Sequence, residues 1–101
     1  MEQQKAARLI SEDGTITNIK PANGINFSLQ ELYKLIDCEL VEVKAVKNIR
    51  VSFKPAPGYI IMDEEGKLRG KALNAMATQL YGNPNDFIVG KVVVCSKSMF
   101  K

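Results

Sequence analysis

The alternation of apolar and polar residues predicts a chain rich in β-strands. Residues 6–11 and 15–20 are strand-like runs on either side of an Asp-Gly step, which favours a hairpin because glycine readily takes the positive φ of tight turns. Apolar and polar residues alternate at 41–45 and at 49–54, so we expect the runs 40–46 and 49–54 each to be a strand with one polar face, and we expect a turn between them at residues 47–48.

Two further runs, residues 59–62 and 87–95, are almost continuously apolar. Such runs are typical of strands that are buried on both faces, so we expect the last run to lie in the centre of the sheet. The polar face of the middle strands is expected to be exposed. It carries Glu42, Lys44, Arg50, Ser52 and Lys54.

Two short helices are predicted between the strands. Ser28 offers an N-cap and Glu31 completes a capping box, and this helix is expected to end at residues 37–38. Its apolar residues share one face; they are Leu29, Leu32, Leu35 and Ile36. The second helix has Asn74 as its N-cap and stops at Gly82. Its inward-facing residues are expected to be Met76, Ala77, Leu80 and Tyr81.

These elements predict an α+β fold, with a mostly antiparallel, twisted sheet of five to seven strands and two short helices on one face. The order strand, acidic Gly turn, strand, loop, helix, strand occurs twice, in residues 6–46 and 59–95. Two interpretations stay open: hairpins that share the same turn chemistry, or a ββαβ pseudo-repeat that arose by duplication. A chain of 101 residues has room for one core, so residues 1–101 are expected to form a single domain.

No segment of the sequence predicts secretion or a membrane. The first residues lack the apolar core of a signal peptide, and no apolar run approaches the roughly 18 residues that a membrane helix needs. Two cysteines, Cys38 and Cys95, indicate reduced thiols better than a disulfide scaffold, but the sequence leaves a bridge between them open. We therefore expect a cytoplasmic monomer or homodimer with no membrane partner.

The composition argues against most catalytic designs. The chain has no histidine, which removes the commonest general base and the commonest metal ligand. Its glycines do not fall into a phosphate-binding spacing, and two cysteines without histidine cannot close a zinc site. We therefore expect a protein that is not an enzyme and that has no cofactor and no metal.

One dense acidic cluster, residues 63–66, precedes three cations. We interpret it as a solvated hairpin turn, because its carboxylates lack the alternate spacing of a calcium loop. Lys67, Arg69 and Lys71, with Asn74 at the start of the second helix, form a candidate anion-binding set, since a helix N-terminus favours negative charge. Neutralisation of charge across the turn is the alternative interpretation.

A second basic set lies on the middle strands. Lys44, Arg50 and Lys54 form a candidate nucleic-acid-binding set, with Phe53 and Tyr59 nearby as aromatic platforms. The net charge is +3, from 14 basic and 11 acidic residues, so the composition permits a polyanionic partner without requiring one. A solvated sheet face is the competing interpretation.

Most of the chain, residues 27–95, resembles a known family. Residues 63–74, DEEGKLRGKALN, are similar to an N-E-x-G-K-L-x-G-x-x-x-N segment of an uncharacterised domain family found in phages, plasmids and other bacterial mobile elements. Residues 86–94 are similar to the D-x-I-x-G-x-x-x-V final strand of that family, and residues 32–43 resemble its upstream segment. The resemblance spans residues 27–95, with Asp63 where the family often has asparagine. It implies a genetic context and no reaction.

These observations predict a small non-enzymatic accessory binding module of a mobile element, with an unknown protein as the expected partner. The exposed sheet face and residues 66–74 are the expected working surfaces. One alternative is an anion-binding or nucleotide-binding protein that uses the basic loop before the second helix. The other is a weak nucleic-acid binder that uses the middle strands.

Overall fold

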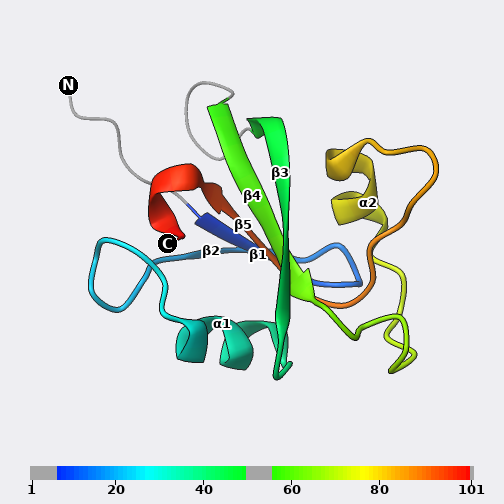
Figure 1. The fold of residues 1–101 in the computed structure, drawn as a ribbon, viewed down its shortest axis with the longest axis horizontal. Coiled ribbons are helices and arrows are strands. Elements are labelled where there is room, and N and C mark those ends of the chain that lie inside the picture. Colours follow the sequence, from blue (N-terminus) through cyan, green and yellow to red (C-terminus); the bar gives the residue numbers. More distant parts are fainter. Residues whose placement is uncertain (1–6, 50–55, 101) are drawn as a thin grey trace.

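The computed structural model describes residues 7–49 and 56–100. They form an α+β fold in which a five-stranded antiparallel sheet has the order β2-β1-β5-β4-β3 (Figure 1). The strands are β1 (Ala7–Ile10), β2 (Ile16–Ile19), β3 (Val41–Ile49), β4 (Ala56–Asp63) and β5 (Val92–Ser96). The helical elements are α1 (Leu29–Ile36), α2 (Ala75–Tyr81) and the 3-10 helix η1 (Lys97–Met99).

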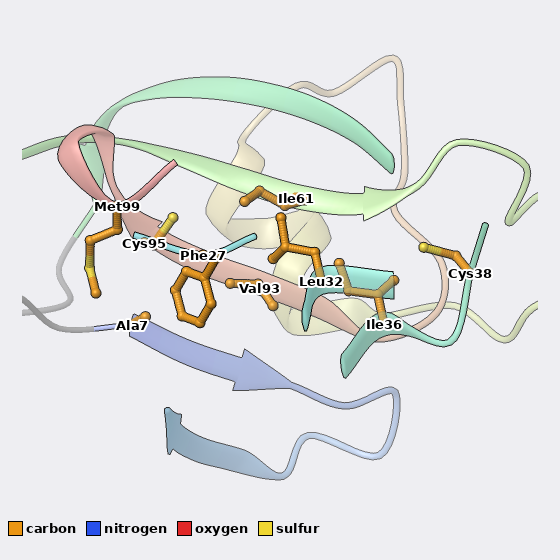
Figure 2. Close-up of a cluster of buried hydrophobic side chains, with 9 residues drawn as sticks. All are labelled: Ala7, Phe27, Leu32, Ile36, Cys38, Ile61, Val93, Cys95 and Met99. Carbon is orange, nitrogen blue, oxygen red and sulfur yellow. The ribbon is translucent and has the colours of Figure 1, made fainter. Parts of the chain in front are cut away.

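The two α-helices cover opposite faces of the sheet, so the prediction that both lie on one face was wrong. Leu32 and Ile36 of α1 pack on one side in a cluster that includes Val93 of β5 (Figure 2). Ala77 of α2 packs on the other side, in a cluster that includes Val92 of β5. Successive residues of a strand point to opposite faces, so the continuous apolar run of β5 supplies side chains to both clusters. A strand that is apolar on both sides needs cover on both sides.

Helix α1 forms where the capping box predicted it. The Ser28 hydroxyl accepts a hydrogen bond from the Glu31 N–H at 3.2 Å, and the Glu31 carboxylate accepts one from the Ser28 N–H at 2.9 Å. Leu32 and Ile36 are completely buried. The helix ends at Asp37, which takes a left-handed conformation with a φ of 61°. Its last carbonyls are therefore free of intrahelical partners and need donors from elsewhere.

Helix α2 is rotated relative to the prediction. The Asn74 side chain accepts a hydrogen bond from the Ala77 N–H at 3.0 Å, and Gly82 ends the helix with a φ of 73°. Because Asn74 is completely buried, Ala77 on the same side of the helix faces the sheet. Met76 and Leu80, which were predicted to face inward, are instead 37% and 39% exposed.

Three strand boundaries differ from the prediction. Strand β4 begins at Ala56, three residues before the predicted run at residues 59–62. Strand β3 continues through residues 47–48, where a turn was expected, and almost all of the predicted strand at residues 49–54 lies outside the described residues. Strand β5 begins at Val92 and not at residue 87. Gly90 has a positive φ of 77°, which breaks the extended conformation just before β5.

The second half of the chain does not form the ββα part of the pseudo-repeat that the sequence left open. In the first half, β1 and β2 form the predicted hairpin, in which the Ser11 N–H donates to the Thr15 carbonyl at 2.9 Å. After β4, by contrast, residues 64–70 form turns and no strand. The Asp63 side chain at the end of β4 is buried and contacts Glu65, Arg69 and Lys71 within these turns and just after them.

Candidate functional site

The connection between β4 and α2, residues 64–73, is organised around one buried carboxylate, and we call it the Asp63 loop. Asp63 is the last residue of β4, and its side chain is only 1% exposed. Its carboxylate pairs with Lys71 at 2.8 Å and with Arg69 at 3.0 Å, and it accepts a hydrogen bond from the Glu65 N–H at 2.9 Å. The interpretation of this acidic cluster as a solvated turn was therefore wrong for Asp63.

The ion pairs of Asp63 also decide its ionisation. Burial acts to raise the pKa of this carboxyl group. The hydrogen bond from Lys71, the backbone hydrogen bond from Glu65 and the nearby charge of Arg69 outweigh burial, so the pKa of Asp63 is lowered overall. Asp63 is therefore an ionised, charge-compensated group at neutral pH. It anchors the loop and is not an unpaired acid.

Lys71 connects the Asp63 loop to the end of α1. Its ammonium group donates to the carbonyl of Asp37 at 2.7 Å and to that of Ile36 at 3.2 Å. Arg69 donates to the same Asp37 carbonyl at 3.4 Å. Cations at a helix C-terminus satisfy the free carbonyls and compensate the helix dipole. One lysine thus ties together β4, α1 and the loop that leads to α2.

Asn74 fixes the other end of the loop. Besides capping α2, its amide group donates to the carbonyl of Ile10 at 3.1 Å and to that of Gly90 at 2.8 Å. The Asn74 N–H also donates to the Ile88 carbonyl at 2.8 Å. Every hydrogen-bonding group of this side chain is therefore used inside the protein, between α2, β1 and the segment before β5. None of them faces a surface where an anion could bind.

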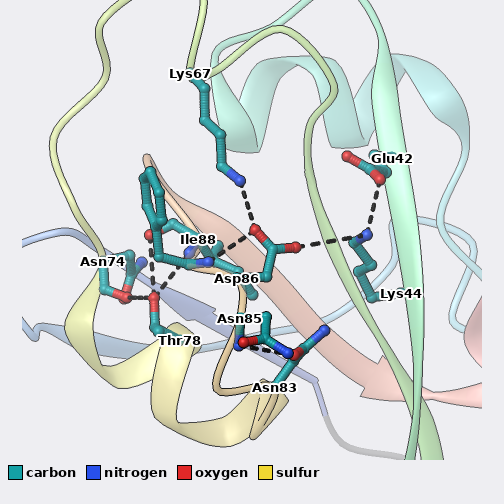
Figure 3. A network of polar contacts seen from close by, with 10 residues as sticks. Glu42, Lys44, Lys67, Asn74, Thr78, Asn83, Asn85, Asp86 and Ile88 are labelled. Atoms are coloured by element: carbon teal, nitrogen blue, oxygen red, sulfur yellow. Dashed lines mark hydrogen bonds and ion pairs between the residues drawn. The ribbon is translucent and has the colours of Figure 1, made fainter.

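A second charged cluster lines a small pocket beside the loop (Figure 3). The Asp86 carboxylate lies between the ammonium groups of Lys67 and Lys44, and Lys44 also pairs with Glu42 at 3.0 Å. The Lys67 ammonium lies 4.3 Å from the centre of the Phe87 ring, a cation–π distance. The hydrogen bond from Lys67 is the main reason that the pKa of Asp86 is lowered, and the hydrogen bond to Glu42 raises the pKa of Lys44.

Two hollows among the described residues lack the features of a small-molecule site. The pocket beside Asp86 has a volume of about 110 Å³, well below the roughly 300 Å³ at which small-molecule sites begin. A second, shallow groove of about 340 Å³ lies over the end of α1, open to solvent. Its charged residues are of mixed sign, with Lys34 and Arg69 against Asp37 and Glu39. Neither hollow is lined by one sign of charge.

The structure does not bring the four candidate anion-binding residues together around one open space. Lys67 pairs with Asp86, whereas Arg69 and Lys71 both pair with Asp63. The fourth residue, the Asn74 that begins α2, is completely buried. Neutralisation by the acidic turn, the alternative interpretation, therefore applies to Arg69 and Lys71, whereas Lys67 is paired with a carboxylate outside the turn.

Only one of the three candidate nucleic-acid-binding residues can be placed. Lys44 lies on β3, where it pairs with carboxylates and its ammonium group is 5.4 Å from the centre of the Tyr81 ring. Arg50 and Lys54 lie outside the described residues. Lys44 is opposite Ile60 in the β3–β4 register, and Ile60 belongs to the cluster under α2. Its face of the sheet is therefore the face that α2 covers.

Exposed apolar side chains gather around α2, which the sequence analysis missed. Met76 and Leu80 lie one turn apart on the outward side of the helix. Leu73, just before the helix, is also exposed and forms an isolated bridge with Val89, two residues from the exposed Phe87. We call Leu73, Met76, Leu80 and Phe87 the α2 surface. The Asp63 loop adds Leu68, which is 88% exposed.

A signal in the sequence could have revealed this surface. Residues 72–85 contain no charged side chain, although 25% of the whole chain is charged. Fourteen residues at that frequency would carry about three or four charges. An exposed element without charged residues indicates a surface that is suited to contact with another protein as well as with water.

Neither thiol is activated as a nucleophile. Cys38 and Cys95 are both buried and both free, so the disulfide that the sequence left open is not formed. Burial raises the pKa of Cys95 to about 12, and burial followed by the charge of Asp63 raises the pKa of Cys38. Both side chains are therefore protonated at neutral pH, and a protonated thiol is a poor nucleophile.

No helix in residues 7–49 and 56–100 is long and apolar enough to cross a membrane. In the same residues, no group of three His, Cys, Asp or Glu side chains is placed to hold a metal ion.

The comparisons with known proteins give one match. The model of a family described as a domain of unknown function, DUF3846, matches residues 8–99. Comparisons with curated proteins and with solved structures found no match. The family match confirms the resemblance to an uncharacterised domain family, and it covers more of the chain than residues 27–95, on which the resemblance was based.

Proposed function

Because the chain belongs to the DUF3846 family of domains of unknown function, we propose a function on the basis of its own surface: it is a small non-enzymatic module that binds another protein through the α2 surface. The observation that carries the proposal is the position of the exposed apolar side chains. Five of the nine large hydrophobic side chains that are exposed in the described residues lie between residues 68 and 87. Single exposed apolar residues are ordinary, whereas a group of them on one structural unit is typical of a protein contact.

The α2 surface is held in place before any partner binds. The buried Asn74 amide fixes the start of α2, and the Thr78 hydroxyl accepts a hydrogen bond from the Ile88 N–H at 2.8 Å (Figure 3). The Asp63 ion pairs hold the loop that leads to the helix. A contact surface that is already ordered loses less conformational entropy on binding, so more of its contact energy appears as affinity.

The chemistry of the surface defines the kind of partner. No charged residue occurs in residues 72–85, and the two charges beside Phe87, those of Lys67 and Asp86, already pair with each other. A charge placed against it would lose its hydration without compensation. We therefore expect a partner that presents an uncharged, apolar patch, and we expect an affinity that hardly depends on salt. A polyanionic ligand would give the opposite salt dependence.

Several features support the absence of catalysis. The sequence has no histidine, and the thiols are buried and protonated. The carboxylates of Asp63 and Asp86 are both in ion pairs, so neither is poised as a general acid. The pocket beside Asp86 is small, at about 110 Å³.

Site-specific photo-crosslinking in the native host cell tests the proposal. A photoreactive amino acid is placed at Met76 or Leu80, and in a matched control at Leu29, an exposed leucine of α1. We expect one protein to crosslink from the first two positions and not from the third. The purified partner should then bind the wild-type chain, and Met76→Glu and Leu80→Glu should each weaken binding about tenfold or more, while Leu29→Glu should not. Equal weakening by all three substitutions would contradict the proposal, provided that thermal unfolding shows each variant folded.

The two alternative functions are outcomes of a second experiment. A thermal-shift screen with nucleotides, inorganic phosphate and oligonucleotides at two salt concentrations reports any ligand that binds only the folded chain. We expect no shift. A nucleotide shift that Lys67→Ala and Arg69→Ala abolish would favour the anion-binding function. An oligonucleotide shift that salt removes, and that Lys44→Ala weakens, would favour nucleic-acid binding.

We also propose that the module is an accessory protein of a bacterial or phage mobile element and acts in the cytoplasm. The resemblance carried by residues 63–74 and 86–94 supports this context. The genes that neighbour the coding sequence test it. Integrase, replication or phage structural genes on either side are expected, and a position among housekeeping genes would contradict it.

A further inference from the structure

The two edge strands of the sheet differ in how they are protected. Strand β3 carries charged side chains, namely Glu42, Lys44 and Lys47, and its register against β4 is irregular near its end. Charges and irregularities of this kind prevent an edge from pairing with another strand. Strand β2 at the other edge has neither feature. Residues 14–19, GTITNI, contain no charge, and the residues of β2 are β-branched except for Asn18.

The hydrogen-bonding groups of β2 can be assigned from its register with β1. The Ser11 N–H donates to the Thr15 carbonyl, so Ser11 and Thr15 are a hydrogen-bonded pair. Hydrogen-bonded and non-hydrogen-bonded pairs alternate along an antiparallel ladder. Thr17 opposite Leu9 therefore bonds to β1, whereas Ile16 and Asn18 direct their N–H and C=O groups to the open edge. The side chains of residues 15–18 are exposed as well.

We propose that two copies of this chain associate through β2, which pairs antiparallel with its own copy about a twofold axis at Thr17. In that register Ile16 of one copy is opposite Asn18 of the other, and each such pair exchanges two backbone hydrogen bonds. The two Thr17 residues face each other at the centre as a non-hydrogen-bonded pair. The five-stranded sheet becomes a continuous ten-stranded sheet with β3 at both outer edges. The proposal is independent of the α2 surface.

The charges at the two ends of β2 fit a second copy better than an arbitrary strand. The turn before β2 carries Glu12 and Asp13, and Lys20 follows its end. Antiparallel pairing about Thr17 places Lys20 of one copy beside the acidic turn of the other, at both ends of the contact. Because the strand between these ends is neutral, no like charges face each other along it. Each copy has acidic residues before β2 and a lysine after it, so two copies related by a twofold axis bring opposite charges together at both ends. This arrangement suits an isologous contact.

Sedimentation of the purified full chain over a wide concentration range tests the association. We expect the weight-average mass to rise from the monomer value of 11.2 kDa towards twice that value. Asn18→Pro removes one outward N–H from each copy, so we expect the dimer to dissociate about tenfold more readily or more. Leu80→Glu, which alters the α2 surface, should leave the dimer unchanged. A mass that stays at the monomer value up to millimolar concentration would overturn the proposal.

A pair of charge variants keeps the test decisive even if proline perturbs the hairpin. Thr17 lies opposite its own copy, so Thr17→Lys and Thr17→Glu should each be monomeric, and an equimolar mixture of the two should form a heterodimer. Amide hydrogen exchange gives an independent measurement. The N–H groups of Ile16 and Asn18 should become protected only at high concentration, whereas that of Thr17 should be protected at all concentrations. Dimerisation that Asn18→Pro and both Thr17 variants leave intact would place the contact elsewhere.

Discussion

Replacing Asp63 by asparagine removes the charge at the centre of the Asp63 loop and keeps a side chain of nearly the same shape. The side chain is 1% exposed, and its partners differ: the Lys71 side chain is 14% exposed and that of Arg69 is 46% exposed. Breaking a fully buried ion pair costs about 3–5 kcal/mol, and an exposed pair is worth about 0–1 kcal/mol. The substituted asparagine would still offer an oxygen to the cations, and Lys71 keeps its bonds to the Ile36 and Asp37 carbonyls. We therefore expect Asp63→Asn to lower the free energy of unfolding by about 2 kcal/mol at pH 7.

The pH dependence of this loss identifies its cause. The pKa of Asp63 is lowered from its ordinary value of 3.8, so the ion pairs stabilise the folded chain fully above the unfolded-state pKa. That stabilisation is lost as the pH falls through the still lower folded-state pKa. The difference between the wild type and Asp63→Asn should thus be constant from pH 7 to about pH 5 and should shrink below pH 4.

Urea unfolding at several pH values measures both quantities. The matched control is Glu64→Gln, which removes the exposed neighbouring carboxylate and is expected to change the free energy of unfolding by less than about 0.5 kcal/mol. Other carboxylates with lowered pKa values, such as Asp86, affect the wild type and both variants alike. The reasoning would be refuted if Asp63→Asn cost no more than Glu64→Gln at pH 7, or if its cost were the same at pH 3.

Two further predictions concern the same region, and urea unfolding measures both. Asn74→Ala removes the α2 cap and the two hydrogen bonds that the amide donates to the Ile10 and Gly90 carbonyls, so we expect a loss of about 3 kcal/mol. Asn74→Asp should not restore stability, since it lacks the amide donor, and a cost equal to that of the exposed Asn85→Ala would contradict this. Gly66→Ala places a Cβ 2.9 Å from a Val89 methyl group, which we expect to cost about 1–3 kcal/mol. The double variant with Val89→Ala should recover part of that loss, and additive costs would disprove the clash.

Several elements could be predicted because short-range interactions decide them. The capping box of Ser28 and Glu31 satisfies backbone donors within four residues, so α1 starts where the sequence says it does. The Asp-Gly step between β1 and β2 fixes a hairpin in the same local way, with Gly14 at a φ of 91°. The apolar run before Cys95 correctly indicated a central strand.

The orientation of α2 could not be predicted from its own residues. Met76, Ala77, Leu80 and Tyr81 allow more than one inward face by their spacing alone. The choice depends on Asn74, whose amide needs the carbonyls of Ile10 and Gly90. Those groups come from β1 and from the segment before β5, and a sequence pattern does not show that they meet. The α2 surface is exposed as a result of this buried polar contact.

The role of Asp63 was hidden for a related reason. Its burial is stable because Lys71 also satisfies carbonyls of Ile36 and Asp37, residues more than 30 positions earlier in the chain. In the sequence Asp63 is the first of three consecutive acidic residues in a turn, and such residues are ordinarily exposed to solvent. The candidate anion-binding cations do not share one site, because Lys67 pairs with Asp86 whereas Arg69 and Lys71 pair with Asp63. These pairings became visible only in three dimensions.

The sequence by itself determined the class of fold, the positions of both helices, the hairpin at the start and the membership of an uncharacterised family. Each of these follows from contacts between residues that are close along the chain, or from a continuous pattern of apolar residues. Only the tertiary structure decided that the helices lie on opposite faces, that Asp63 is buried and that Met76 and Leu80 point outward. These depend on which distant backbone groups meet a side chain, because burying a polar group is favourable only when its partners are already there.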